Sequence, residues 1–186
     1  MSLDLYKQYQ PKLRTGDLLS WSSDSALGWL IRKFTKSDVN HSGMVIRFSD
    51  YEEQNGASRR FTLEALEHGI DLHLISRRLE KHKGCVYWHA LQERFDEKRP
   101  LLGAVALKHV GVAYDYRSLF KNILGKVSAE ASKLFCSEYV YLTFTQCQFT
   151  PEMSDVKAMM NWASGKAPTP ADMPKLGWWD DRIRIF

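Results

Sequence analysis

The chain is 186 residues long, with 44% hydrophobic and 26% charged side chains. This composition is typical of a globular domain with one sizeable core and excludes collagen-like, low-complexity and wholly disordered chains. The net charge is +4, and the densest basic stretch, at residues 77–83, is interrupted by Glu80. We therefore expect a single domain over residues 1–186 and no nucleic-acid partner. Nothing in the sequence indicates an oligomeric state.

The chain shows no apolar run of the roughly 20 residues that a membrane helix needs. Lys108 and His109 interrupt the longest candidate, residues 101–112. Charged and amide side chains occupy residues 1–13, where a secretory signal would carry an uninterrupted apolar segment. Three cysteines leave at least one thiol unpaired, which suits a reducing compartment. We expect a cytoplasmic protein with no transmembrane segment.

Alternating apolar residues and helical spacing predict the elements. In chain order they are a strand at 17–21, a helix at 24–34, strands at 42–48, 61–66, 70–75 and 85–89, and helices at 100–110, 117–124 and 134–146. A hairpin loop is expected at 51–60, and Thr150-Pro151 and Thr169-Pro170 are typical of helix starts. The short connections between the strands favour a mostly antiparallel sheet with helices packed on it, an α+β fold.

Cys136 lies at the start of the predicted helix 134–146. Backbone N–H groups without helical partners point toward a side chain there, and the helix dipole adds positive potential, so a thiolate is stabilised. This is where a nucleophilic cysteine gains most in reactivity. A small buried core residue is the alternative interpretation, and position alone does not decide between them.

His41 and Glu64 are the candidate partners of such a nucleophile. His41 precedes the predicted strand 42–48, where an imidazole anchored on a rigid sheet can act as a general base. Alternation in the strand 61–66 places Glu64 on the face opposite Leu63, where a carboxylate is either solvated or paired. A nearby imidazole would be a suitable partner, because the hydrogen bond would orient it and keep it basic.

The remaining cysteines give no second site. Cys147 lies about three helical turns after Cys136, roughly 16 Å along the axis, so the two cannot bridge within one helix. Cys147 and Cys85 are expected in the core. Cys85 and His89 form a lone C-x₃-H pair with no second ligand pair, so no structural zinc is expected. Hydrolysis by a cysteine nucleophile and a histidine base needs neither a metal nor an organic cofactor, and we expect none.

A set of weak motifs, in this order and spacing, resembles one family. The motifs are Leu-Arg-Thr-Gly-Asp-Leu-Leu at 13–19, Asn-His-Ser-Gly-Met-Val at 40–45, Leu-Glu-Ala at 63–65 with Gly-Ile at 69–70, Gly-Val-Ala-Tyr-Asp at 111–115, Phe-Cys-Ser-Glu-Tyr-Val at 135–140 and Thr-Pro-Ala-Asp at 169–172. The chain is thereby similar to the YiiX-like, circularly permuted papain-fold cysteine hydrolases, relatives of NlpC-type cell-wall peptidases and of lecithin retinol acyltransferase.

This resemblance implies specific roles. Cys136 matches the family nucleophile, His41 the histidine base and Glu64 the polar residue that orients the base. Asp17, after Gly16, matches a position that we interpret as structural, pinning the turn into the first strand. Glu138 also matches a position of the family motif, and a carboxylate in the first helical turn interacts favourably with the helix dipole.

The expected function is a thiol hydrolase, a cysteine peptidase or amidase that cleaves an amide bond through an acyl-enzyme. Its substrate would be a small peptide, a cell-wall peptide or an acyl-amide such as a γ-glutamyl compound. Two alternatives stay open on the same scaffold. One is hydrolysis or transfer of a lipid ester or thioester, with Trp21, Trp29 and Phe34 lining a groove. The other is a binding module without turnover.

Overall fold

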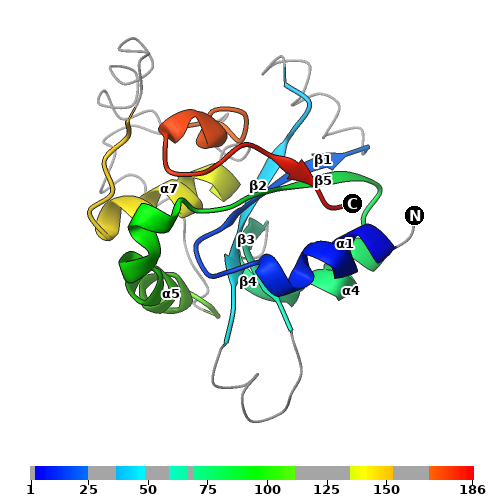
Figure 1. Ribbon diagram of the computed structural model, residues 1–186, viewed down its shortest axis with the longest axis horizontal. Helices are drawn as coiled ribbons and strands as arrows, with labels where there is room; N and C mark the ends of the chain where they lie inside the picture. The colour runs from blue at the N-terminus through cyan, green and yellow to red at the C-terminus, as the bar shows by residue number, and fades with distance from the viewer. Residues whose placement is uncertain (1–2, 25–36, 49–58, 67–68, 112–134, 153–167) are drawn as a thin grey trace.

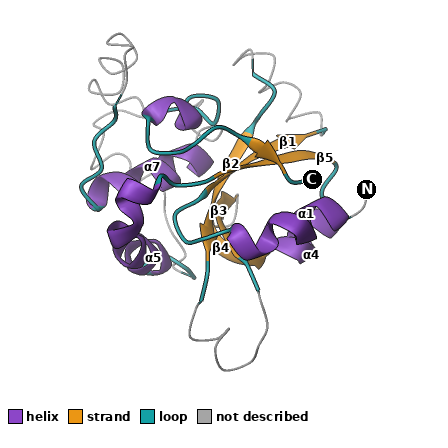
Figure 2. Ribbon diagram, viewed as in Figure 1, coloured by secondary structure: helices purple, strands orange, loops and turns teal. Residues whose placement is uncertain are grey.

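The computed structural model describes residues 3–24, 37–48, 59–66, 69–111, 135–152 and 168–186. Their centre is a six-stranded sheet in the order β4-β3-β2-β1-β5-β6, in which all neighbours are antiparallel (Figures 1 and 2). The strands are β1 (Leu18–Ser23), β2 (His41–Ile46), β3 (Phe61–Leu66), β4 (Gly69–Leu74), β5 (Gly84–His89) and β6 (Ile183–Arg184). The α+β class and the antiparallel sheet agree with the prediction.

Helices cover both faces of this sheet. On one face lie α5 (Arg99–Leu107) and α7 (Phe135–Gln146), and on the other lie α1 (Asp4–Tyr9) and α4 (Ile75–Glu80) (Figure 1). Short 3-10 helices span Gln10–Lys12, Glu93–Lys98 and Met173–Leu176. No helix in the described ranges is long and apolar enough to cross a lipid bilayer.

Strand alternation divides the core into two clusters, one on each face. The cluster under α5 and α7 includes Leu18, Met44, Leu63, Leu102, Val140 and Phe144. The cluster under α1 and α4 includes Tyr6, Leu19, Val45, Ile75, Leu79 and Val86. Consecutive residues of β1 and β2 therefore contribute to opposite clusters, and the sheet is buried on both sides.

Most predicted elements that fall in the described ranges are present. All five strands are found within a few residues, and the helices predicted at 100–110 and 134–146 are α5 and α7. The helices predicted at 24–34 and 117–124 lie outside the described residues, as does most of the loop at 51–60. The helix start predicted at Thr150 is not seen in the two residues that follow, beyond which the chain is not described.

The C-terminal part corrects one boundary. Thr169-Pro170 does not open a helix directly. The backbone N–H groups of Asp172 and Met173 donate to the Thr169 carbonyl and close a turn first, and the Thr169 hydroxyl also donates to Asp172 Oδ2 at 2.6 Å. The 3-10 helix begins only at Met173. Elements α1, α4 and β6 were not predicted, because they are too short for a periodic pattern to identify.

The buried carboxylate of Asp17 joins the start of β1 to the rest of the fold. Its oxygens accept hydrogen bonds from the backbone N–H of Arg14 (2.8 Å) and Leu91 (3.1 Å), from Trp88 Nε1 (2.8 Å) and from Arg99 Nη1 (2.8 Å). The preceding Gly16 has φ of +92°, and a Cβ there would lie 3.0 Å from Leu91. Asp17 thus pins the turn into the first strand, as expected.

Replacing Asp17 with Ala should destabilise the protein strongly. The substitution removes the buried carboxylate bonded to Arg99 Nη1 and leaves the Trp88 indole N–H and the Leu91 N–H without their acceptor, although Arg99 Nε keeps its bond to Asp96. Breaking one side of a buried ion pair typically costs about 3–5 kcal/mol. Urea unfolding monitored by Trp fluorescence measures the change. Asp4→Ala is the control, since Asp4 is exposed on α1 and its removal should alter the unfolding free energy by less than about 0.5 kcal/mol. Similar stabilities for the two variants would contradict this prediction.

Candidate active site

Cys136 is the second residue of α7, and its side chain is buried. Its sulfur accepts hydrogen bonds from the backbone N–H groups of Ser42 and Ser137. Ser137 supplies one of the N–H groups that the first turn of a helix leaves without a helical partner. Ser42 reaches the sulfur from β2, which pairs with β3 only from Met44 onward. The helix start and the first residues of β2 therefore form one cradle around the thiol.

His41 is the first residue of β2, and its ring lies between a carboxylate and the thiol. Its Nε2 is 2.6 Å from Glu64 Oε2, and the ring is also hydrogen-bonded to the Cys136 thiol. Because Nε2 is engaged by Glu64, Nδ1 is the nitrogen left for the sulfur. The imidazole side chain is only 18% exposed, so solvent competes little for either bond.

Glu64 lies in β3 with its side chain fully buried, on the same face of the sheet as His41. Besides His41, it binds Arg78 of α4, which donates from Nε to Oε1 at 3.2 Å and from Nη2 to Oε2 at 3.3 Å. The close approach of β2 requires glycine at position 43, where a Cβ would lie 2.6 Å from Thr62 Oγ1 and 3.0 Å from Glu64 Cγ. The glycine of the Asn-His-Ser-Gly motif makes room for the carboxylate.

The electrostatics of these groups favour a thiolate beside an imidazolium. Burial raises the pKa of Cys136, but the charge and hydrogen bond of His41 and the two backbone N–H groups outweigh it, so the net shift is downward. Burial lowers the pKa of His41, yet the thiolate, followed by Glu64, raises it to about 10. The pKa of Glu64 is lowered, because His41 and Arg78 together overcome the effect of burial.

The structure thus brings Cys136, His41 and Glu64 together and places the other two cysteines, Cys85 and Cys147, elsewhere. All three thiols are free. Cys147 is buried just after α7, as expected, and burial raises its pKa. The prediction that Cys85 lies in the core is wrong, because alternation along β5 places it at a partly exposed position between buried Gly84 and Val86. Glu138 lies in the first turn of α7 as predicted, but it is buried, and that burial raises its pKa to about 7.

Arg78 was not predicted as part of the site. The basic stretch at 77–83, which includes it, was considered only for nucleic-acid binding, which its interruption by Glu80 does not favour. Residues 77–80 of this stretch belong to α4, whose Ile75 and Leu79 are buried in the core. The spacing of those two apolar residues was the only available signal, and over six residues it is too weak to identify a helix.

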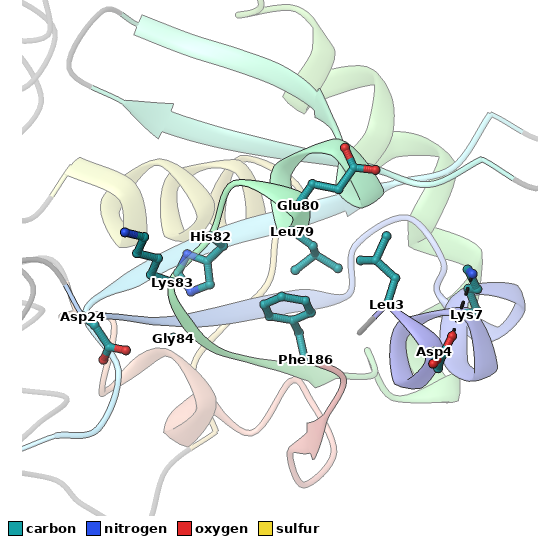
Figure 3. A pocket seen from close by; sticks show the side chains of 10 residues that line it. All are labelled: Leu3, Asp4, Lys7, Asp24, Leu79, Glu80, His82, Lys83, Gly84 and Phe186. Atoms are coloured by element: carbon teal, nitrogen blue, oxygen red, sulfur yellow. Dashed lines mark ion pairs between the residues drawn. The ribbon is translucent and has the colours of Figure 1, made fainter. Parts of the chain in front are cut away.

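A cavity of about 640 Å³ lies near this site but is not part of it. It is lined by Leu3, Asp4, Lys7, Asp24, Leu79, Glu80, His82, Lys83, Gly84 and Phe186 (Figure 3). His82 packs edge-on against Trp21, with ring centroids 5.1 Å apart, and the Trp21 ring lies 6.5 Å from that of His41. The buried indole of Trp21 therefore separates the cavity from the imidazole.

Comparisons with known proteins support the fold. No protein-family model and no curated protein matches the chain. Among solved structures, the chain matches the crystal structure of the metalloprotein YiiX from Escherichia coli O157:H7, described as DUF1105. The TM-score is 0.61 and the identity 19%, over 92% of this chain and 96% of that one. The protein therefore has a YiiX-like fold.

The description as a metalloprotein applies to that neighbour. Within the ranges described, no three His, Cys, Asp or Glu side chains are grouped so that they could hold a metal ion. Both nitrogens of His41 already have partners, Glu64 on one side and Cys136 on the other. Its ring could bind a metal only by giving up one of these bonds.

Iodoacetamide at neutral pH should modify Cys136 before Cys85 and Cys147. The thiolate is the reactive species, and a neighbouring imidazole lowers the pKa of Cys136, whereas burial raises that of Cys147. Peptide mapping of a timed reaction on the native protein measures the order. Accessibility alone would give the opposite result, since Cys85 is more exposed than Cys136. Earlier labelling of Cys85 would therefore contradict an activated Cys136.

The thiolate of Cys136 should be observable by its absorbance at 240 nm in the wild type at pH 7, with Cys136→Ser as the blank. A lowered pKa means that this signal is present above the folded-state pKa and is lost only as the pH falls through it. In His41→Gln, burial still raises the pKa of Cys136 but no imidazolium lowers it, so the thiolate signal should appear only at alkaline pH. Identical titration curves for the wild type and His41→Gln would show that the two side chains are not coupled.

Proposed function

We propose that this protein is a cysteine-dependent hydrolase that cleaves an amide bond of a small peptide or acyl-amide through an acyl-enzyme. The observation that carries the proposal is the arrangement of one histidine ring, bound to a fully buried carboxylate at one nitrogen and to a buried thiol at the other. This is the geometry of an activated nucleophile, a base and an orienting group. The order His41, Glu64, Cys136 along the chain matches a circularly permuted papain-like fold.

In the first half of the reaction, the Cys136 thiolate attacks the carbonyl carbon of the substrate. Charge develops on the carbonyl oxygen, where backbone N–H groups at the start of α7, including that of Cys136, would stabilise it. The His41 imidazolium gives its proton to the leaving nitrogen as the C–N bond breaks. The amine departs, and the acyl group remains on sulfur as a thioester.

In the second half, the neutral His41 ring takes a proton from a water molecule as its oxygen attacks the thioester. The C–S bond breaks, the carboxylic acid leaves, and the imidazolium and thiolate form again. Glu64 holds the ring in place through both halves and stabilises its positive charge. The residues present therefore suffice for a complete cycle.

The two alternatives differ in how they fit the site. The contact between Cys136 and His41 supports turnover over a binding module, which has no use for an activated thiol. Ester or thioester hydrolysis and acyl transfer can use the same three residues. Trp21 is buried, while Trp29 and Phe34 lie outside the described residues. The favoured function is therefore amide hydrolysis.

We expect measurable hydrolysis of small acyl-peptide or γ-glutamyl amides by the wild type. Cys136→Ala should abolish it while leaving the circular dichroism spectrum unchanged. Glu64→Gln should lower kcat less than Cys136→Ala does, because the orienting residue contributes less than the nucleophile. Release of the amine product, followed by fluorescence, measures both effects.

Matched substrates separate the alternatives. Turnover of long-chain acyl esters or thioesters without amide cleavage would move the assignment to the ester or acyl-transfer branch. Inertness toward both classes, in protein whose Cys136 is selectively alkylated, would instead favour the binding module.

A further inference from the structure

Arg78 contacts the candidate catalytic set without reaching the thiol. It projects from α4 and donates two hydrogen bonds to Glu64, one to each carboxylate oxygen. Its guanidinium carbon lies 5.0 Å from the centre of the Trp21 ring. The planar fork of arginine suits both contacts, whereas the point charge of lysine does not. Ile75 and Leu79, buried on the same helix, hold α4 against the sheet.

Glu64 needs a second cation because its surroundings disfavour a charge. The side chain is fully buried, and an acidic residue, Asp71, lies directly opposite it on β4. His82, from the turn after α4, is also nearby, but burial lowers its pKa, so it brings no positive charge at neutral pH. On β2 the facing group is His41, whose other partner is Cys136 on α7. Arg78 is therefore the permanently charged group that faces Glu64.

The ionisation of Glu64 decides which nitrogen of His41 carries a proton. A carboxylate accepts from Nε2–H and leaves Nδ1 free to take the proton of Cys136. A protonated Glu64 could donate to Nε2 instead, so that a neutral ring would carry its proton on Nδ1, facing the thiol. That tautomer cannot accept a proton from sulfur. A group that keeps Glu64 ionised therefore keeps His41 able to accept the proton of Cys136.

We propose that Arg78 is a positioning residue that holds Glu64 as a carboxylate against His41 and thereby keeps Cys136 in its reactive, deprotonated form. The inference rests on the proposed function and adds a fourth member to the relay, in the order Arg78, Glu64, His41, Cys136. Arg78 acts through Glu64 and does not contact the reacting atoms.

The test is the pH profile of Cys136 alkylation by iodoacetamide in Arg78→Met. The acid limb of the profile should move to higher pH by about one unit, so that labelling on that limb becomes roughly tenfold slower than in the wild type. Arg77→Met is the matched control, because Arg77 is the neighbouring arginine on α4, is 74% exposed and forms a surface ion pair with Glu80. Its profile should equal that of the wild type.

A double variant establishes the route of the effect. If Arg78 acts through Glu64, then Glu64→Gln with Arg78→Met should give the same profile as Glu64→Gln alone. An equal shift in both backgrounds would overturn the proposal, since Arg78 would then act directly on the thiol or through the fold. A shift to lower pH would also overturn it, because Arg78 would then act chiefly by repelling the imidazolium.

Two further controls keep the outcome clear. If Arg78→Met does not fold, Arg78→Gln and Arg78→Lys replace it, and the neutral Gln should shift the profile more than the charged Lys. An unshifted profile in every folded variant at position 78 would refute the role of Arg78 alone. A wild type without selective labelling of Cys136 would instead refute the proposed hydrolase itself.

Discussion

The hydrogen-bonded carboxylate of Asp17 is the contact on which the rest of the structure depends. It lies where β1 begins, and β1 is the strand between β2 and β5. Through Trp88, Leu91 and Arg99 it joins β1 to β5, to the segment that follows β5, and to α5. Each bond satisfies a polar group that burial would otherwise leave unpaired, so the charge is tolerated only as long as all of these elements are in place.

Glu64 is also a buried carboxylate paired with an arginine, but its second partner differs from those of Asp17. Both carboxylates are buried in the sheet, and each is held by an arginine from a neighbouring helix, Arg99 of α5 or Arg78 of α4. Every oxygen of Asp17 is occupied by groups that stay fixed. Glu64 instead shares its charge with His41, a group that can gain and lose a proton. The first arrangement is suited to stability and the second to proton transfer.

The candidate site lies where the two layers of the molecule meet. Glu64, Trp21 and α4 belong to one face of the sheet, whereas α7 with Cys136 packs on the other (Figure 1). His41 can contact both because it is the first residue of β2, beyond the part of that strand that pairs with β3. Each layer can therefore hold its own part of the site rigidly, and only one imidazole has to bridge them. This division is the structural basis of the proposal that the thiol depends on residues that it does not touch.

The sequence by itself determined the properties that come from local periodicity. Alternation in β3 placed Glu64 opposite Leu63, and the start of the apolar helix placed Cys136 among unpaired N–H groups. Only the tertiary structure decided which of these residues meet. His41 and Glu64 are 23 positions apart, and their 2.6 Å contact depends on the pairing of β2 with β3 and on Gly43. Arg78 faces Glu64 rather than solvent because the six-residue helix α4 packs against the sheet. That helix is held by the burial of its apolar side chains against strands distant in sequence. The pattern of residues within six positions does not encode such contacts.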